Sequence, residues 1–170
     1  ANLALLRSIK HLFSLGADLK LLAGNHDLRL LMGLRALKLK HCPTTEHLFV
    51  RMGPKVIPLF KEVYDEYLAG SNHLKGIPDE SACRAKLYPS NQWFDEFPAK
   101  AKWLMSSQSI ERERKRMKKK IDIFEKACKE EGFSMRDIYA IALKCYQLFI
   151  KPSGEFAWFF KKMELACQEG

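Results

Sequence analysis

Residues 18–31, read as DLKLLAGNHDLRLL, carry the pattern that decides the fold prediction. The apolar run over 18–23 has the length of a buried strand, and the polar tetrapeptide at 24–27 ends it. A helix is expected from residue 28 to about residue 40. An amphipathic helix over residues 3–13 precedes the run and is closed by Gly16. Helix, strand, polar loop and helix in this order is typical of an α/β layer.

The rest of the chain is predicted to be helical. Pro54 can open a helix that ends at Gly70, and residues 70–92 are expected to form a loop with one short helix. The apolar stripe of the helix before this loop consists of Val56, Phe60, Val63 and Tyr67.

One long helix is predicted over residues 98–131, starting at Pro98. Its apolar seam has the alternating 4-3 spacing of a packed helix and consists of Trp103, Ser107, Ile110, Arg114, Met117, Ile121, Phe124 and Cys128. Ser134 and Ser153 are the expected N-caps of two further helices. The seam of the first consists of Met135, Ile138, Ala142, Cys145 and Phe149. Short connections predict that these three helices pack as antiparallel neighbours.

Composition indicates an ordinary globular protein. The 170 residues are 47% hydrophobic and 29% charged, which excludes a disordered chain, a collagen-like repeat and a disulfide scaffold. No apolar run approaches the roughly 20 residues of a membrane-spanning helix, so no membrane partner is expected. The five cysteines are odd in number and form no C-x-x-C pair. This usage predicts a cytoplasmic protein with free thiols.

The tetrapeptide Gly24-Asn25-His26-Asp27 is the sharpest candidate for chemistry. An Asn side chain offers a metal an oxygen ligand without adding negative charge, and a neighbouring His can transfer a proton near pH 7. Gly24 permits close approach of backbone at a tight turn. The structural alternative is a plain loop in which Asn25 caps the helix and His26 is a surface residue.

The stretch LLAGNHDLRLL, with the amphipathic helix before it, resembles the calcineurin-like metallophosphoesterases, whose third signature is Gly-Asn-His followed by Asp or Glu. The resemblance implies hydrolysis of phosphate esters at a centre with two divalent metal ions of the Mn, Fe or Zn class. It implies that Asn25 binds one metal and that His26 assists the leaving oxygen. Gly24 and Asp27 would have supporting roles, and the substrate would be a phosphorylated molecule.

The other signatures of that family are not found. No Asp-x-His or Gly-Asp motif precedes residue 24, and no Gly-His-x-His follows it. We therefore expect a piece of a longer protein that needs the remainder of the catalytic domain as its partner and is inactive alone. Its fold class would be mainly α. Residues 1–40 would form a partial phosphoesterase core with one or two strands, and residues 41–170 a helical insertion or cap.

The basic run over 111–120, read as ERERKRMKKK, offers a second interpretation. Its candidate anion-binding residues are Arg112, Arg114, Lys115, Arg116, Lys118 and Lys119. Under this interpretation the chain is a non-enzymatic helical module that binds an anionic partner through the helix over 98–131. A nucleic-acid partner is disfavoured, because no aromatic residues interleave with the run. The bland alternative is a solvated helix with pairs such as Glu111–Lys115.

A third cluster lies at residues 41–47, read as HCPTTEH. It contains two imidazoles, a thiol and a carboxylate, all of which can bind transition metals. The six-residue spacing of His41 and His47 fits neither a helix nor a strand. The cluster is expected to be a plain loop, with substrate contact beside the phosphoesterase motif as its functional alternative.

Overall fold

The computed structural model describes residues 2–38, 50–89 and 91–165, and its central helix is α7 (Met135–Phe149). Ser134 starts this helix as predicted, because its Oγ accepts a hydrogen bond from the Asp137 N–H at 3.2 Å. Asp137 returns the interaction by accepting from the Ser134 N–H at 2.9 Å. The predicted seam is confirmed, since Met135, Ile138, Ala142, Cys145 and Phe149 are all buried.

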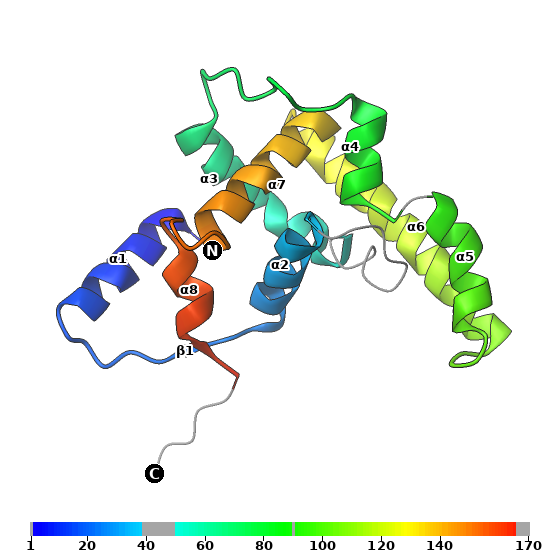
Figure 1. Cartoon of the computed structure of the whole chain (residues 1–170), viewed down its shortest axis with the longest axis horizontal. Helices are drawn as coiled ribbons and strands as arrows, with labels where there is room; N and C mark the ends of the chain where they lie inside the picture. Colours follow the sequence, from blue (N-terminus) through cyan, green and yellow to red (C-terminus); the bar gives the residue numbers. More distant parts are fainter. Residues whose placement is uncertain (1, 39–49, 90, 166–170) are drawn as a thin grey trace, which may run out of the picture.

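Four helices pack against α7: α2 (Asn25–Ala36), α3 (Ile57–Tyr67), α4 (Glu80–Leu87) and α8 (Ala157–Lys162) (Figure 1). The predicted stripe is confirmed, because Val56 directly before α3 and Phe60 and Val63 within it are buried, and Tyr67 is half-buried. α4 is the one short helix expected within residues 70–92. α1 (Leu3–Ser14) joins the same hydrophobic core through Leu3 and Leu6. The mainly α fold class is thus confirmed.

The prediction of one helix over residues 98–131 is wrong. The chain forms two helices, α5 (Asn91–Ala101) and α6 (Ser107–Glu130), and Pro98 lies inside α5. The break is set by Ser106, whose Oγ accepts from the Ser109 N–H at 3.2 Å and so caps α6. The seam is confirmed only from Ile110 onward. Trp103 lies in the turn between the two helices and is 80% exposed.

Antiparallel packing of α6 on α7 is also wrong. The two helices meet at the turn that contains Gly132 and diverge from it (Figure 1). α6 packs instead on α5 and on η2 (Val50–Val56), a 3-10 segment. α7 and α8 do pack together, with the rings of Phe149 and Phe156 stacked at 5.1 Å. Ser153 does not cap α8, which begins at Ala157 after Phe156.

The predicted strand is shorter and more exposed than expected. β1 (Leu21–Leu22) pairs in parallel with β2 (Met163–Glu164), a strand that the sequence pattern did not reveal. The Ala23 N–H extends the pairing by donating to the Glu164 carbonyl oxygen at 2.9 Å. Leu22 is 58% exposed, because a two-stranded sheet cannot cover both of its faces. The α/β character of the predicted layer is therefore confined to this pair of strands.

The division at residue 40 stays a prediction. Apolar side chains from both sides of it form one buried cluster, which joins Leu30 and Leu34 of α2 to residues of α3 and α7. Within the described residues, no helix has the length and apolar character that crossing a bilayer would require.

Candidate functional site

The tetrapeptide at 24–27 forms the junction between β1 and the first turn of α2. Gly24 is the N-cap residue in an extended conformation, with φ −81° and ψ 162°. Its N–H donates to Oδ2 of Asp27 at 3.0 Å. Asp27 therefore caps the start of α2, and the supporting role in a phosphoesterase site stays a prediction. Gly24 has no left-handed φ. Its missing Cβ leaves room for the Asp27 carboxylate, since a Cβ there would lie 3.1 Å from Oδ2.

Asn25 and His26 are both exposed at this junction. Asn25 is the first residue of α2 and Gly24 is the N-cap, so the structural alternative is wrong about the cap but right that His26 is a surface residue. Its side chain forms no hydrogen bond within the part of the chain that the structure describes. The role of the Asn25 amide as a metal ligand stays a prediction.

Lys55 is the neighbour of His26 that the sequence did not predict. Its Nζ lies 3.3 Å from Nε2 of His26, although the two residues are 29 positions apart. Lysine is a donor only, so Nε2 must accept and the proton of the neutral ring lies on Nδ1. Gly53, with φ 59°, makes the turn in η2 that precedes Lys55. The arrangement places a cation beside an imidazole whose remaining N–H can donate.

The ligand set for a metal pair is incomplete in this site. Asn25 supplies one neutral oxygen, and no group of three or more His, Cys, Asp or Glu side chains gathers as a metal site among residues 2–38, 50–89 and 91–165. These residues do not by themselves fit a two-metal centre. The cluster over residues 41–47 lies outside the described residues.

The three described cysteines, Cys83, Cys128 and Cys145, are free and buried. Burial raises the pKa of Cys128 to about 12 and also raises the pKa of the other two thiols. These thiols are therefore protonated at neutral pH and behave as small apolar groups, as predicted for Cys128 and Cys145.

A serine, an aspartate and a histidine also meet at the start of α7, but in an order that does not activate the serine. His73 Nε2 lies 2.8 Å from Oδ1 of Asp137, and Ser134 Oγ donates to Oδ2 of the same carboxylate at 2.5 Å. Asp137 stands between the other two, so the hydroxyl has a carboxylate and no imidazole as its partner. A catalytic serine needs the imidazole in the middle. This cluster is therefore structural.

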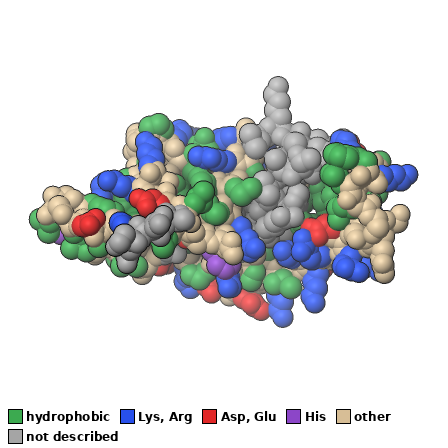
Figure 2. Space-filling model, turned by 90° about the horizontal axis from the view of Figure 1, so that it is seen from below, with side chains coloured by type: hydrophobic (Ala, Val, Ile, Leu, Met, Phe, Trp, Pro, Cys, Tyr) green, Lys and Arg blue, Asp and Glu red, His purple; other side chains and the backbone are tan. Residues whose placement is uncertain are grey.

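The six candidate cations of α6 fall into distinct environments. Arg116 pairs with Glu113 at 2.6 Å, and Arg114 pairs with Glu111 at 3.1 Å, so the expected Glu111–Lys115 pair is replaced. The remaining four, Arg112, Lys115, Lys118 and Lys119, are exposed. Figure 2 shows Lys and Arg side chains on several sides of the part of the molecule that contains α5 and α6. Charge alone therefore does not define one binding face.

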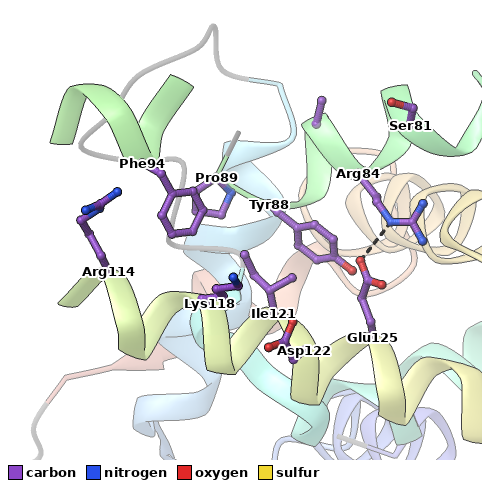
Figure 3. A pocket seen from close by; sticks show the side chains of 11 residues that line it. Ser81, Arg84, Tyr88, Pro89, Phe94, Arg114, Lys118, Ile121, Asp122 and Glu125 are labelled. Atoms are coloured by element: carbon purple, nitrogen blue, oxygen red, sulfur yellow. Dashed lines mark hydrogen bonds and ion pairs between the residues drawn. The ribbon is translucent and has the colours of Figure 1, made fainter. Parts of the chain in front are cut away.

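A groove of about 790 Å³ lies between α4 and α6 and receives two of those six cations. Arg114 and Lys118 line it near Phe94, while Arg84 and Glu125 line it further along α6 (Figure 3). The Arg84 Nε donates to Oε1 of Glu125 at 3.0 Å, which neutralises both charges. This groove shares no residue with the junction at 24–27.

Comparison of the chain with protein-family models finds no match, and comparisons with curated proteins and with solved structures find none either.

Proposed function

We propose that this chain contributes Asn25 and His26 to the active centre of a metal-dependent phosphoesterase that hydrolyses phosphate esters. The observation that carries the proposal is the placement of the tetrapeptide. It follows a parallel strand and opens a helix, and it leaves the Asn25 amide and the His26 imidazole exposed. Ligands in α/β proteins collect at the carboxyl ends of parallel strands.

Lys55 adds a second argument for an anionic substrate. Its exposed ammonium group lies beside His26, where it would attract a phosphate group. The first N–H groups of α2 point toward the same junction and favour negative charge there. The Nδ1–H of the neutral His26 ring would donate a hydrogen bond to the negative charge that develops on the leaving oxygen in ester hydrolysis. Both side chains thus fit a substrate with a phosphoryl group.

Exposed leucines on α1 and β1 support the proposal that another layer of protein packs here and completes the metal site. Leu5 and Leu12 on α1, Leu15 directly after it, and Leu22 on β1 are exposed although they are large and apolar. Apolar side chains on a helix and a parallel strand usually pack against a further layer. We propose that this layer supplies the other metal ligands. Bound metals would stabilise the charge of the phosphoryl group. The buried free thiols agree with a cytoplasmic location, which is part of the proposal.

The proposal predicts that His26 is required for turnover in the full-length gene product. We expect His26→Ala to reduce the Mn²⁺-dependent hydrolysis of p-nitrophenyl phosphate about 100-fold or more, because removing one hydrogen-bond donor from a developing oxyanion costs roughly that much. His11→Ala is the matched control, since His11 is also exposed and lies on α1 away from the junction. The control should keep its activity. Circular dichroism should show the same helical content for the wild type and both variants.

Normal hydrolysis by His26→Ala would exclude the phosphoesterase proposal. The second candidate, a helical module that binds an anionic partner through α6, would then gain support. The observation that favours it is the exposure of Arg112, Lys115, Lys118 and Lys119. Under that function, binding should weaken steeply with salt and should be lost when Arg114, Lys115, Arg116 and Lys118 are neutralised together. His26→Ala should leave such binding unchanged.

A further inference from the structure

The groove between α4 and α6 has rigid apolar walls. Tyr88 is buried, its hydroxyl lies 2.8 Å from the Met135 sulfur, and its ring meets Phe124 edge-to-face at 6.2 Å. Phe94 is held edge-to-face against the buried Trp93 at 4.9 Å. Ile121 of α6 lines the groove between these two aromatic rings (Figure 3). Because the core fixes the walls, a ligand would meet a surface that is already formed.

Charge is distributed unevenly along this groove. Lys118 is exposed and forms no ion pair or hydrogen bond within the described part of the chain. Arg114, one turn earlier on α6, keeps a buried Nε without a partner, although its Nη1 pairs with Glu111. Toward the other end lie Asp122 and the neutralised pair of Arg84 with Glu125. The end near Phe94 is therefore cationic, and at the opposite end Asp122 is the lining carboxylate that has no ion-pair partner among the described residues.

We propose that this groove binds an acidic peptide segment of a partner protein. A carboxylate of the peptide would lie between Arg114 and Lys118, and an adjacent apolar side chain would pack against Phe94 and Ile121. The acidic end of the groove decides between a peptide and a nucleic acid. A continuous phosphate backbone along α6 would meet the Asp122 carboxylate and be repelled, whereas a peptide can carry its negative charge at one end only. The proposal does not depend on the phosphoesterase function.

The test uses fluorescence anisotropy with a fluorescein-labelled peptide that has Glu-Glu-Leu-Phe at its centre. We expect Lys118→Glu to weaken binding about tenfold or more, because it reverses the one cation lining the groove that has no ion-pair partner among the described residues. Lys119→Glu is the matched control. It makes the same change of charge on the same helix at an exposed residue that does not line the groove. The control should weaken binding less than about twofold.

Three further peptide and variant measurements separate the proposal from its rivals. Replacing Leu-Phe by Ser-Ser in the peptide should weaken binding about tenfold, which tests the apolar contact without risk to folding. His26→Ala should bind the peptide normally. Equal losses for Lys118→Glu and Lys119→Glu would overturn the proposal in favour of diffuse attraction. Undetectable binding by the wild type, or equally tight binding of a single-stranded oligonucleotide, would also overturn it.

Discussion

Asp137 fastens the loop before α4 to the start of α7, together with its neighbour Arg136, whose guanidinium donates to the Pro78 carbonyl oxygen at 2.9 Å. It accepts a hydrogen bond from Nε2 of His73 at 2.8 Å and two from Ser134. Burial would raise the pKa of Asp137, but the hydrogen bonds from His73 and Ser134 outweigh it and lower the pKa below the ordinary value. The folded protein therefore holds this carboxylate in its charged form more strongly than the unfolded chain does.

The sign of the pH dependence follows from this difference. The stabilisation by Asp137 is fully present above the pKa that this carboxyl group has in the unfolded chain, near pH 4. It is lost as the pH falls through the lower pKa of Asp137 in the folded protein. We expect Asp137→Asn to lower the free energy of unfolding by about 1–2 kcal/mol at pH 7. The loss should be smaller at pH 3. Urea unfolding at both pH values measures it.

Asp95→Asn is the control for this substitution, because Asp95 is exposed on α5. Its effect should stay within about 0.5 kcal/mol at either pH. An equal loss for Asp137→Asn at pH 7 and pH 3 would show that the charge of the carboxylate does not matter. The cluster would then act through shape and neutral hydrogen bonds only.

Single residues also show what the sequence could reveal of the candidate sites. The exposed positions of Asn25 and His26 follow from a local pattern of apolar and polar residues, so they were predictable. Lys55 reaches His26 from 29 positions away, through a turn whose direction no local pattern indicates. Lys118 and Lys119 are adjacent lysines in the same basic run, and the sequence pattern does not distinguish them. Only the packing of α4 beside α6 places one of them in a groove.

Among the elements, α6 shows why periodicity predicted a seam correctly and a helix start wrongly. The apolar spacing is set by packing and identifies Ile110, Met117, Phe124 and Cys128 as buried. The same spacing continues by coincidence to Trp103, beyond the true start. The start depends on one hydrogen bond from the Ser109 N–H to the Ser106 side chain, which competes locally with continued helix.

This difference predicts a large effect on stability for one residue of the expected seam and almost none for another. Met117→Ala should cost about 2–5 kcal/mol of unfolding free energy, because Met117 is fully buried at 0% exposure. Trp103→Ala should change it by less than about 0.5 kcal/mol, despite the larger side chain removed. Guanidinium unfolding followed by circular dichroism compares the two. A large loss of unfolding free energy for Trp103→Ala would show that Trp103 is packed against the core, as the predicted seam required.

At the scale of the whole molecule, the two ends of the chain are tied together. β1 pairs with β2, and Arg7 of α1 donates from Nε to Oε1 of Glu155 at 2.6 Å. The Arg7 guanidinium also donates to the Tyr67 hydroxyl at 2.8 Å and thereby contacts α3. None of these contacts was predictable, since each joins segments that are distant in sequence and lack a shared motif.

Such coupling predicts a single cooperative unfolding transition for the described fold. Two tryptophans can report on its opposite parts. Trp93 is buried at α5, and Trp158 of α8 meets Phe13 of α1 edge-to-face at 5.8 Å. We would prepare two variants that each retain one of these and replace the other tryptophans by Phe. In each variant, urea midpoints from fluorescence and from far-UV circular dichroism should coincide.

Comparison within each variant removes the effect of the substitutions themselves, because both signals come from the same protein. Trp158 decides the outcome, since it lies where α1 and α8 meet. If its fluorescence changed at lower urea than the circular dichroism signal, the region around α1 would unfold separately from the helices around α7. Residues 1–40 would then behave as a unit of their own, and the shared cluster would be too weak to couple them. Coincident midpoints would mean that the buried cluster couples α1 to the helices around α7, so that both unfold together.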